Sequence, residues 1–315
     1  MPEWLYESGI GEARAALVDD DRIIVAAIEP DDTGPLVGGI HPARLTEILP
    51  GRSGRATLAT GEEVWLPKLP ASITQGKALT VEIVRESIPE PGRTKPPRAY
   101  ATDLPPAPAP TLRDRIAATG HPVRECRAHE TDRLEQAGWS EVLEEARTGD
   151  IVFAGGMLLM YATPAMTLFD IDGPPPADAL ALTAAPQIAA AIVRHDIGGS
   201  IGVDFPTIEG KTLRNAVAAA IDEALPQPFE RTAVNGFGFL QIVRPRPRAS
   251  LPERLRADPA GAAARALLRR LEREPPGAPR GQRVSPAVHA KLRARPDWLA
   301  ELARRTGITH EWESG

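Results

Sequence analysis

Residues 163–206 begin with TPAMTLFDIDG and end with IGGSIGVDFP, and this stretch decides the fold. Two short apolar runs, residues 166–169 and 200–203, each end in an aspartate, Asp170 and Asp204. The segment between them carries apolar residues at helical spacing and ends in two glycines. A strand, a helix and a second strand in this order predict a βαβ unit with two parallel strands.

The two aspartates are expected at one edge of a sheet, with residues 184–195 as the intervening helix. Active sites of open α/β sheets gather at the carboxyl ends of such strands. Asp172 faces the same side as Asp170 if its strand continues. Carboxylates that meet there repel one another, and a hard cation such as Mg²⁺ removes this cost. The pattern fits a site for metal-assisted phosphodiester hydrolysis. It fits equally well aspartates that only cap strand ends and begin turns.

Composition limits the function classes. The chain has 315 residues, 42% of them hydrophobic, and a formal net charge of −5, so one large domain or two to three small ones with a real core are expected. The net charge argues against general polyanion binding. The single Cys126 excludes an intrachain disulfide framework and a cysteine-based zinc cage. Because no signal peptide or membrane-spanning run is visible, we expect a cytoplasmic protein without a membrane partner.

Three separated blocks carry a resemblance to a known family. The blocks are TLFDIDG, QIAAAIVRHDIGGSIGVDFP and NGFGFLQIVRPR, and their order, spacing and residue types are similar to the catalytic segment of the ribonuclease E/G family. The resemblance implies an α/β protein whose RNase H-like catalytic domain is interrupted by an inserted S1-type OB-fold β-barrel, with a small C-terminal α/β tail. It also implies that Asp170 and Asp204 bind Mg²⁺, with Mn²⁺ as the alternative, and that Asp172 supports them.

The domain boundaries expected from this organisation follow the composition of the chain. They are residues 1–33 for the first hairpin of the RNase H-like domain, 34–103 for the S1-like barrel, 104–150 for a linker and a remnant segment, 151–249 for the catalytic domain, and 250–315 for a basic helix and a small C-terminal module. Short strands with Gly-rich turns favour the barrel. The pattern also predicts a hairpin over residues 12–29, a helix over 210–225 and a Pro/Gly linker over 275–281.

Cationic and aromatic side chains are the candidates for RNA contacts. They are Trp65, Lys68, Lys95, Arg98, Arg244 and Arg246. Trp65 occupies a position where the family has an aromatic residue, and it is interpreted either as a base-stacking residue or as a core residue of the barrel. The lysines and Arg98 are suited to following phosphates, with a solvated surface as the alternative. Arg244 and Arg246 match the last basic pair of the family, and we expect them to hold a substrate phosphate beside the aspartates.

Two features of the family have no counterpart in this sequence. Residues 104–150 are too short for a region that senses a 5′ monophosphate, and the two-cysteine zinc-link is missing, so we expect no zinc and no zinc-linked dimer. The chain is interpreted as a Mg²⁺-dependent endoribonuclease that cleaves single-stranded RNA. The alternatives are a non-catalytic RNA-binding protein on the same fold and an unrelated metal-dependent phosphohydrolase that acts on nucleotides.

Overall fold

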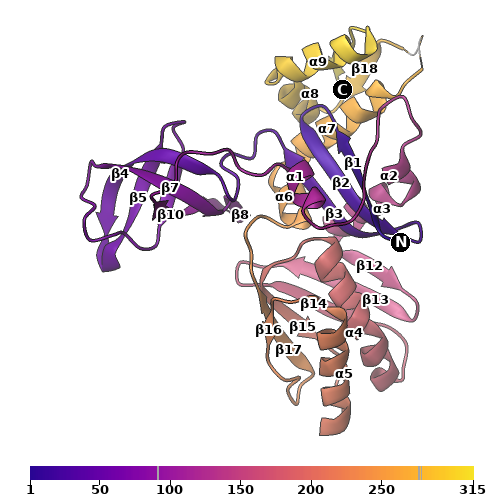
Figure 1. Ribbon diagram of the computed structural model, residues 1–315. Coiled ribbons are helices and arrows are strands. Elements are labelled where there is room, and N and C mark those ends of the chain that lie inside the picture. Colours follow the sequence, from indigo (N-terminus) through magenta and orange to yellow (C-terminus); the bar gives the residue numbers. More distant parts are fainter. Residues whose placement is uncertain (91, 276, 278) are drawn as a thin grey trace. The chain divides into compact units, whose positions relative to one another are not determined.

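The computed structural model describes residues 1–90, 92–275, 277 and 279–315 (Figure 1). The chain forms two compact units. Unit 1 consists of Met1–Asp32, Leu112–Trp139 and Leu255–Gly315, and unit 2 consists of Thr33–Thr111 and Ser140–Arg254. Residue 91 of the predicted barrel and residues 276 and 278 of the predicted linker lie outside the described residues.

Unit 1 contains a four-stranded sheet in the order β11-β1-β2-β3. Its strands are β1 (Glu3–Ser8), β2 (Glu12–Asp19), β3 (Arg22–Pro30) and β11 (Val123–Glu125). The first three strands are antiparallel, and β11 is parallel to β1. Asp20 and Asp21 form the β2–β3 turn with positive φ angles, which short polar side chains tolerate. The predicted hairpin over residues 12–29 is confirmed.

This hairpin lies in a different sheet from Asp170 and Asp204. Its apolar face is buried within unit 1, where Trp4 and Leu17 pack against Leu112 and Ile116 of helix α1 (Leu112–Ala117). A short helix, α2 (Arg133–Gln136), follows β11 in the chain. The expectation that the hairpin and the aspartate strands form one RNase H-like sheet is therefore not confirmed, because each group of strands buries its apolar face in a separate core.

The C-terminal segment adds a small helical module to unit 1. Its elements are α7 (Pro259–Glu272), β18 (Gly281–Val284), α8 (Pro286–Arg293), α9 (Pro296–Thr306) and β19 (Glu311–Ser314), with β18 parallel to β19. The helices share a core with Ile10, which lies between β1 and β2. The predicted basic helix corresponds to α7, and the predicted small C-terminal module consists of α8, α9 and the paired strands β18 and β19.

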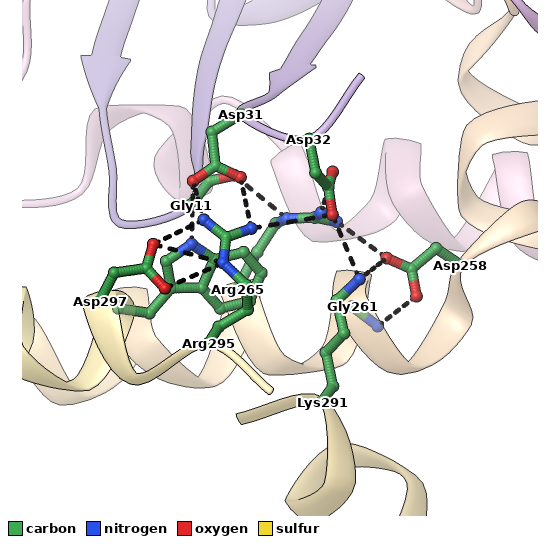
Figure 2. A network of polar contacts seen from close by, with 10 residues as sticks. Gly11, Asp31, Asp32, Asp258, Gly261, Arg265, Lys291, Arg295 and Asp297 are labelled. Atoms are coloured by element: carbon green, nitrogen blue, oxygen red, sulfur yellow. Dashed lines mark hydrogen bonds and ion pairs between the residues drawn. The ribbon is translucent and has the colours of Figure 1, made fainter. Parts of the chain in front are cut away.

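A network of ion pairs ties this module to the end of β3 (Figure 2). Trp298 of α9 is buried, and its indole N–H donates to Asp31 at 2.9 Å. The guanidinium groups of Arg265 and Arg295 lie 5.2 and 4.2 Å from the centroid of its ring. Arg295 also pairs with Asp31 at 2.5 Å. Gly11 lies against the indole, and a Cβ atom at this position would be 2.5 Å from Cε2 of the ring. The network therefore fixes the position of a large aromatic side chain.

A closed five-stranded barrel forms the first part of unit 2. The strands are β4 (Ile40–Leu49), β5 (Ser53–Leu58), β6 (Glu63–Leu66), β7 (Ala78–Arg85) and β10 (Arg98–Thr102), in the order β10-β6-β5-β4-β7. A 3₁₀ turn, η1 (Pro50–Arg52), joins β4 and β5, and a ribbon of β8 (Ile88–Glu90) and β9 (Arg93–Lys95) precedes β10. The interior of the barrel is filled by apolar side chains, among them Val64, Leu66, Val81 and Ile83. The predicted small barrel is confirmed, and it is compatible with an OB-fold.

The second part of unit 2 is a six-stranded sheet in the order β12-β13-β14-β15-β17-β16. The strands are β12 (Asp150–Phe153), β13 (Gly156–Ala162), β14 (Thr167–Asp172), β15 (Gly199–Asp204), β16 (Glu230–Arg231) and β17 (Phe239–Arg244). The helices are α4 (Ala177–Arg194) and α5 (Lys211–Ala224), which lie side by side, with α3 (Trp139–Thr148) before the sheet and α6 (Leu251–Ala257) after it in the chain (Figure 1). The predicted helix over residues 210–225 is confirmed as α5.

The central βαβ unit is confirmed, because β14 and β15 pair in parallel with α4 between them. Helix α4 is longer than predicted, and it continues through Pro186, which lacks a backbone N–H. Its buried alanines, among them Ala181 and Ala184, allow the helix to pack closely on the sheet. No helix in the described part of the chain is long and apolar enough to cross a membrane.

Candidate active site

The predicted aspartates are neighbours on adjacent strands. The parallel ladder of β14 and β15 runs from Thr167 opposite Ile201 to Asp170 opposite Asp204. Both aspartates lie at the carboxyl ends of their strands, where β14 continues for two more residues to Asp172. Neighbouring strands are separated by about 4.8 Å. The register therefore places two carboxylates where they can bind one cation.

The sheet separates these carboxylates from the hydrophobic core. Phe169, Ile171 and Val203 are buried in the core that includes α4 and α5. Because successive side chains of a strand alternate between faces, Asp170 and Asp204 lie on the opposite face of the sheet. Asp172 shares that face with them, since its strand continues as the sequence suggested.

A pocket of about 460 Å³ opens at this edge of the sheet. Its lining consists of the three aspartates, the loop after β14, the start of α4, the residues after β15 and one aromatic side chain of the β16–β17 loop. In full, these residues are Asp170, Ile171, Asp172, Gly173, Pro174, Pro175, Ala177, Leu180, Asp204, Phe205, Pro206, Thr207 and Phe237. The structure therefore brings all three predicted aspartates into one pocket, whereas their catalytic role stays a prediction.

Among the described residues, no basic side chain lines this pocket. The Asp170 Oδ1 atom accepts the backbone N–H of Ile171 at 2.9 Å, which orients the carboxylate. Within the described residues, none of the three pocket carboxylates forms an ion pair, whereas Asp222 on α5 pairs with Arg231. A pocket with unpaired negative charge attracts cations.

The carboxylates at this edge of the sheet suit a cation that binds few protein side chains. Across residues 1–90, 92–275, 277 and 279–315, no group of three or more His, Cys, Asp or Glu side chains is arranged to hold a metal ion. Asp170 and Asp204 are ladder partners, and they form the pair of carboxylates at this edge of the sheet. Mg²⁺ fits such a pair, because it usually binds one or two carboxylates and fills its other positions with water and substrate phosphate oxygens.

Trp65 lies on the outer face of the barrel. It alternates with Val64 and Leu66, which are both fully buried, while Trp65 itself is half-buried. The Arg98 guanidinium lies 5.0 Å from the centroid of the Trp65 ring, and the two residues are neighbours across β6 and β10. The interpretation of Trp65 as a barrel core residue is therefore wrong, because the pleat of β6 turns its side chain outward.

Arginines extend this outer surface on both sides of Trp65. Arg55 on β5 is opposite Trp65, and Arg85 on β7 is opposite Arg98. Burial lowers the pKa of Arg85, and the positive charges of Arg98 and Arg246 lower it further. Arg85 and Arg98 therefore add positive charge beside Trp65, which attracts anions. Arg55 already pairs with Glu47 at 3.5 Å and with Glu63 at 3.7 Å. We call Arg55, Trp65, Arg85 and Arg98 the barrel surface.

The two lysines predicted to contact RNA differ in their surroundings. Lys68 follows β6 and is exposed. Lys95 on β9 forms an ion pair with Glu90 on β8 across the ribbon, and Arg93 shares this partner at 3.2 Å. The charge of Lys95 is therefore already compensated, whereas Lys68 is the better placed of the two lysines for a phosphate.

Arg244 and Arg246 lie away from the aspartates. Because β17 is antiparallel to β15, Phe239 pairs with Asp204, and Arg244 pairs with Gly199 at the other end of the strand. Five residues of strand correspond to roughly 16 Å. Arg244 donates to the carbonyl of Ile197 at 3.2 Å, and Arg246 pairs with Glu253. The expectation that they hold a phosphate beside the aspartates is wrong, because the strand direction separates them. RNA binding elsewhere by these arginines stays a prediction.

Two functional candidates were not singled out from the sequence. Phe237 lines the aspartate pocket, and its sequence signal is an aromatic residue between two glycines in a turn. Arg85 joins the barrel surface, and only the pairing of β7 with β10 reveals this.

Comparison with known proteins adds no assignment. No family model matches the chain, and no curated protein matches it significantly. The resemblance to the ribonuclease E/G family therefore stays a prediction.

Proposed function

We propose that the protein is a metal-dependent endoribonuclease that cleaves single-stranded RNA at the aspartate pocket. The observation that carries this proposal is the pairing of Asp170 with Asp204 across two parallel strands, in a pocket whose three carboxylates have no basic partner among the described residues. A pair of neighbouring carboxylates is suited to hold a metal ion for phosphodiester hydrolysis, because such an ion keeps its remaining positions for water and phosphate.

Each aspartate has a distinct role in this proposal. Asp170 and Asp204 would hold Mg²⁺, or Mn²⁺ in its place. When bound, the ion would polarise a phosphate oxygen and lower the pKa of a bound water. Asp172 lies on the same face but is exposed at the rim of the pocket, where its carboxylate would accept a hydrogen bond from the attacking water.

The barrel supports the assignment of RNA as substrate. Its outer surface presents an aromatic ring between cationic side chains, the combination with which single-stranded nucleic acids are bound through stacking and backbone charge. We propose that the barrel is an S1-type OB-fold. The RNase H-like classification remains a proposal for which the two separate sheets offer no support.

A second candidate is a non-catalytic RNA-binding protein. The observation that favours it is the barrel surface, which is complete without the aspartate pocket. A nucleotide phosphohydrolase, by contrast, would have no use for this surface. The two RNA-directed candidates differ in one respect only, whether bound RNA is cleaved.

The test is cleavage of labelled single-stranded RNA by purified protein with Mg²⁺ and with EDTA. We expect cleavage with Mg²⁺ only. Asp204→Asn should lose cleavage and keep RNA affinity, because it removes a ligand charge and no phosphate contact. Asp150→Asn is the matched control, since Asp150 is an exposed aspartate of the same sheet outside the pocket. Cleavage by Asp204→Asn at the rate of the unmodified protein would disprove the proposed site, and binding without cleavage would favour the second candidate.

A further inference from the structure

Phe237 presents a bare aromatic ring at the aspartate pocket. Its side chain is 85% exposed, and it lines the same pocket as Asp170, Asp172 and Asp204. Exposure alone decides little, because single exposed apolar residues are common on protein surfaces. The position of the ring and the way its backbone is held are more informative.

The loop that carries Phe237 is held in one conformation. The Asn235 carboxamide oxygen accepts the backbone N–H groups of Phe237 at 2.9 Å and Phe239 at 3.1 Å. Gly238 has a φ of +91°, and a Cβ atom there would lie 2.4 Å from the carbonyl oxygen of Phe205. The loop is therefore tightly turned, and Gly238 packs closely against the backbone of Phe205.

This loop is also joined to the segment that carries Asp204, a proposed metal ligand. The backbone N–H of Phe205, the residue after Asp204, donates to the carbonyl of Gly238 at 3.2 Å. Phe239 is the ladder partner of Asp204. The hydrogen bonds therefore fix the backbone of Phe237 relative to the backbone of Asp204. Packing does not cover the ring, so the fold holds it at the pocket without using it in the core.

We propose that Phe237 stacks on an unpaired base next to the scissile phosphate and thereby restricts cleavage to single-stranded RNA. This inference rests on the proposed function, and it makes Phe237 a specificity-determining residue of the site. An aromatic ring stacks on the face of any base, so such contacts tolerate sequence changes. Inside a duplex both faces of a base are already stacked, and the ring has no free face to contact. A phosphodiester can therefore lie at the aspartates while its neighbouring base stacks on Phe237 only where that base is unstacked.

The experiment measures RNA binding in EDTA, where no metal-assisted cleavage occurs, and cleavage with Mg²⁺. The probes are a short single-stranded oligoribonucleotide and matched oligomers in which one abasic unit is moved along the chain. Phe237→Ala should weaken binding or raise KM by roughly 5- to 150-fold, the range of one base–aromatic stack. Phe237→Trp should restore affinity, and its fluorescence should be quenched by the oligomer. Tyr161→Ala, which removes an exposed aromatic ring outside the pocket, is the control.

The abasic oligomers make the inference specific. An abasic unit next to the cleaved bond should weaken binding to the unmodified protein and leave Phe237→Ala unaffected, while the melting temperature of the variant stays unchanged. If Phe237→Ala binds and cleaves like the unmodified protein, or loses affinity equally for every oligomer, the inference is overturned and the proposed function stands. If the unmodified protein neither binds nor cleaves RNA, both are overturned.

Discussion

His195 is a buried titratable side chain at the end of α4. It is 0% exposed, and its Nε2 atom lies 3.2 Å from the Glu145 carboxylate on α3. In the described part of the chain, Nδ1 has no hydrogen-bond partner. Burial lowers the pKa of the imidazole, and the hydrogen bond with Glu145 opposes this only in part. The folded protein therefore keeps His195 neutral at a pH where the unfolded chain begins to bind a proton.

This difference predicts a pH dependence of the stability of unit 2. The imidazole of the unfolded chain titrates near pH 6.5. The stability that neutral His195 contributes is therefore fully present above about pH 6.5 and is lost as the pH falls below that value. His195→Gln should show a smaller decrease in melting temperature between about pH 7.5 and pH 5.5. Thermal unfolding across this range is the measurement, with His121→Gln, a half-buried histidine, as control. Equal pH slopes for His195→Gln and the unmodified protein would contradict this explanation.

Strand β6 places Trp65 outside the barrel core, which allows affinity and stability to be tested separately. Trp65→Ala should reduce affinity for single-stranded RNA by roughly 5- to 150-fold if the ring stacks on a base, with little change in melting temperature. Val64→Ala on the same strand is the matched comparison for stability, because the Val64 side chain is fully buried in the barrel. It should lower the melting temperature and leave RNA affinity nearly unchanged.

The same surface should make binding dependent on salt. Arg98→Ala removes one cation from it and should reduce the slope of log affinity against log salt by about 0.7, the value for one phosphate contact with a single strand. Filter binding at several salt concentrations measures both quantities. A slope that does not change in Arg98→Ala would mean that RNA follows another path.

The β1–β2 turn and helix α9 should be sensitive to small changes, because Gly11 lies directly against Trp298. Gly11 has a φ of +79°, and Gly120 in the same unit has a φ of +80° with open space around its Cβ position. Gly120→Ala should lower the free energy of unfolding by about 1–2 kcal/mol, the cost of holding alanine in the left-handed backbone conformation. Gly11→Ala should lower the free energy of unfolding by about 1–3 kcal/mol more, because its methyl group would overpack against the indole. The indole cannot easily move, since Asp31 and two arginines hold it. Chemical unfolding of both variants gives the comparison.

For the molecule as a whole, we predict that cleavage is nearly indifferent to the 5′ phosphate. The arginines of residues 104–150 are engaged with carboxylates in several cases. Arg113 pairs with Glu125 at 3.3 Å, Arg115 with Glu29 at 2.6 Å and Arg147 with Glu144 at 2.5 Å. A terminal dianion would have to displace these partners. Cleavage rates on two RNAs that differ only in a 5′ mono- or triphosphate decide the point, and a large preference for the monophosphate would refute it.

The same reasoning extends to assembly. With Cys126 as its only cysteine, the chain cannot build a thiolate zinc site within one subunit. We expect a monomer, or a dimer through another surface, whose solution mass does not change with a zinc chelator. A dimer that dissociates on chelation would contradict this expectation.

The βαβ unit could be predicted from the sequence because its signals are local. Strand and helix periodicities lie within residues 163–206, and a βαβ unit permits only a parallel pairing of its strands. The neighbouring positions of Asp170 and Asp204 follow from that connection. The barrel could be anticipated for a similar reason, because short strands and glycine turns succeed one another along a continuous segment.

Other features were decided only by the tertiary structure. The antiparallel direction of β17 moved Arg244 away from the aspartates, and the pleat of β6 turned Trp65 outward. The predicted helix began at residue 184, but α4 begins at Ala177, because packing of its alanines on the sheet stabilises a longer helix. Strand direction, ladder partner and face depend on hydrogen bonds and burial between residues distant in the chain. A local pattern carries no information about those contacts, so the sequence alone determined the aspartate pair and the fold determined which other side chains surround it.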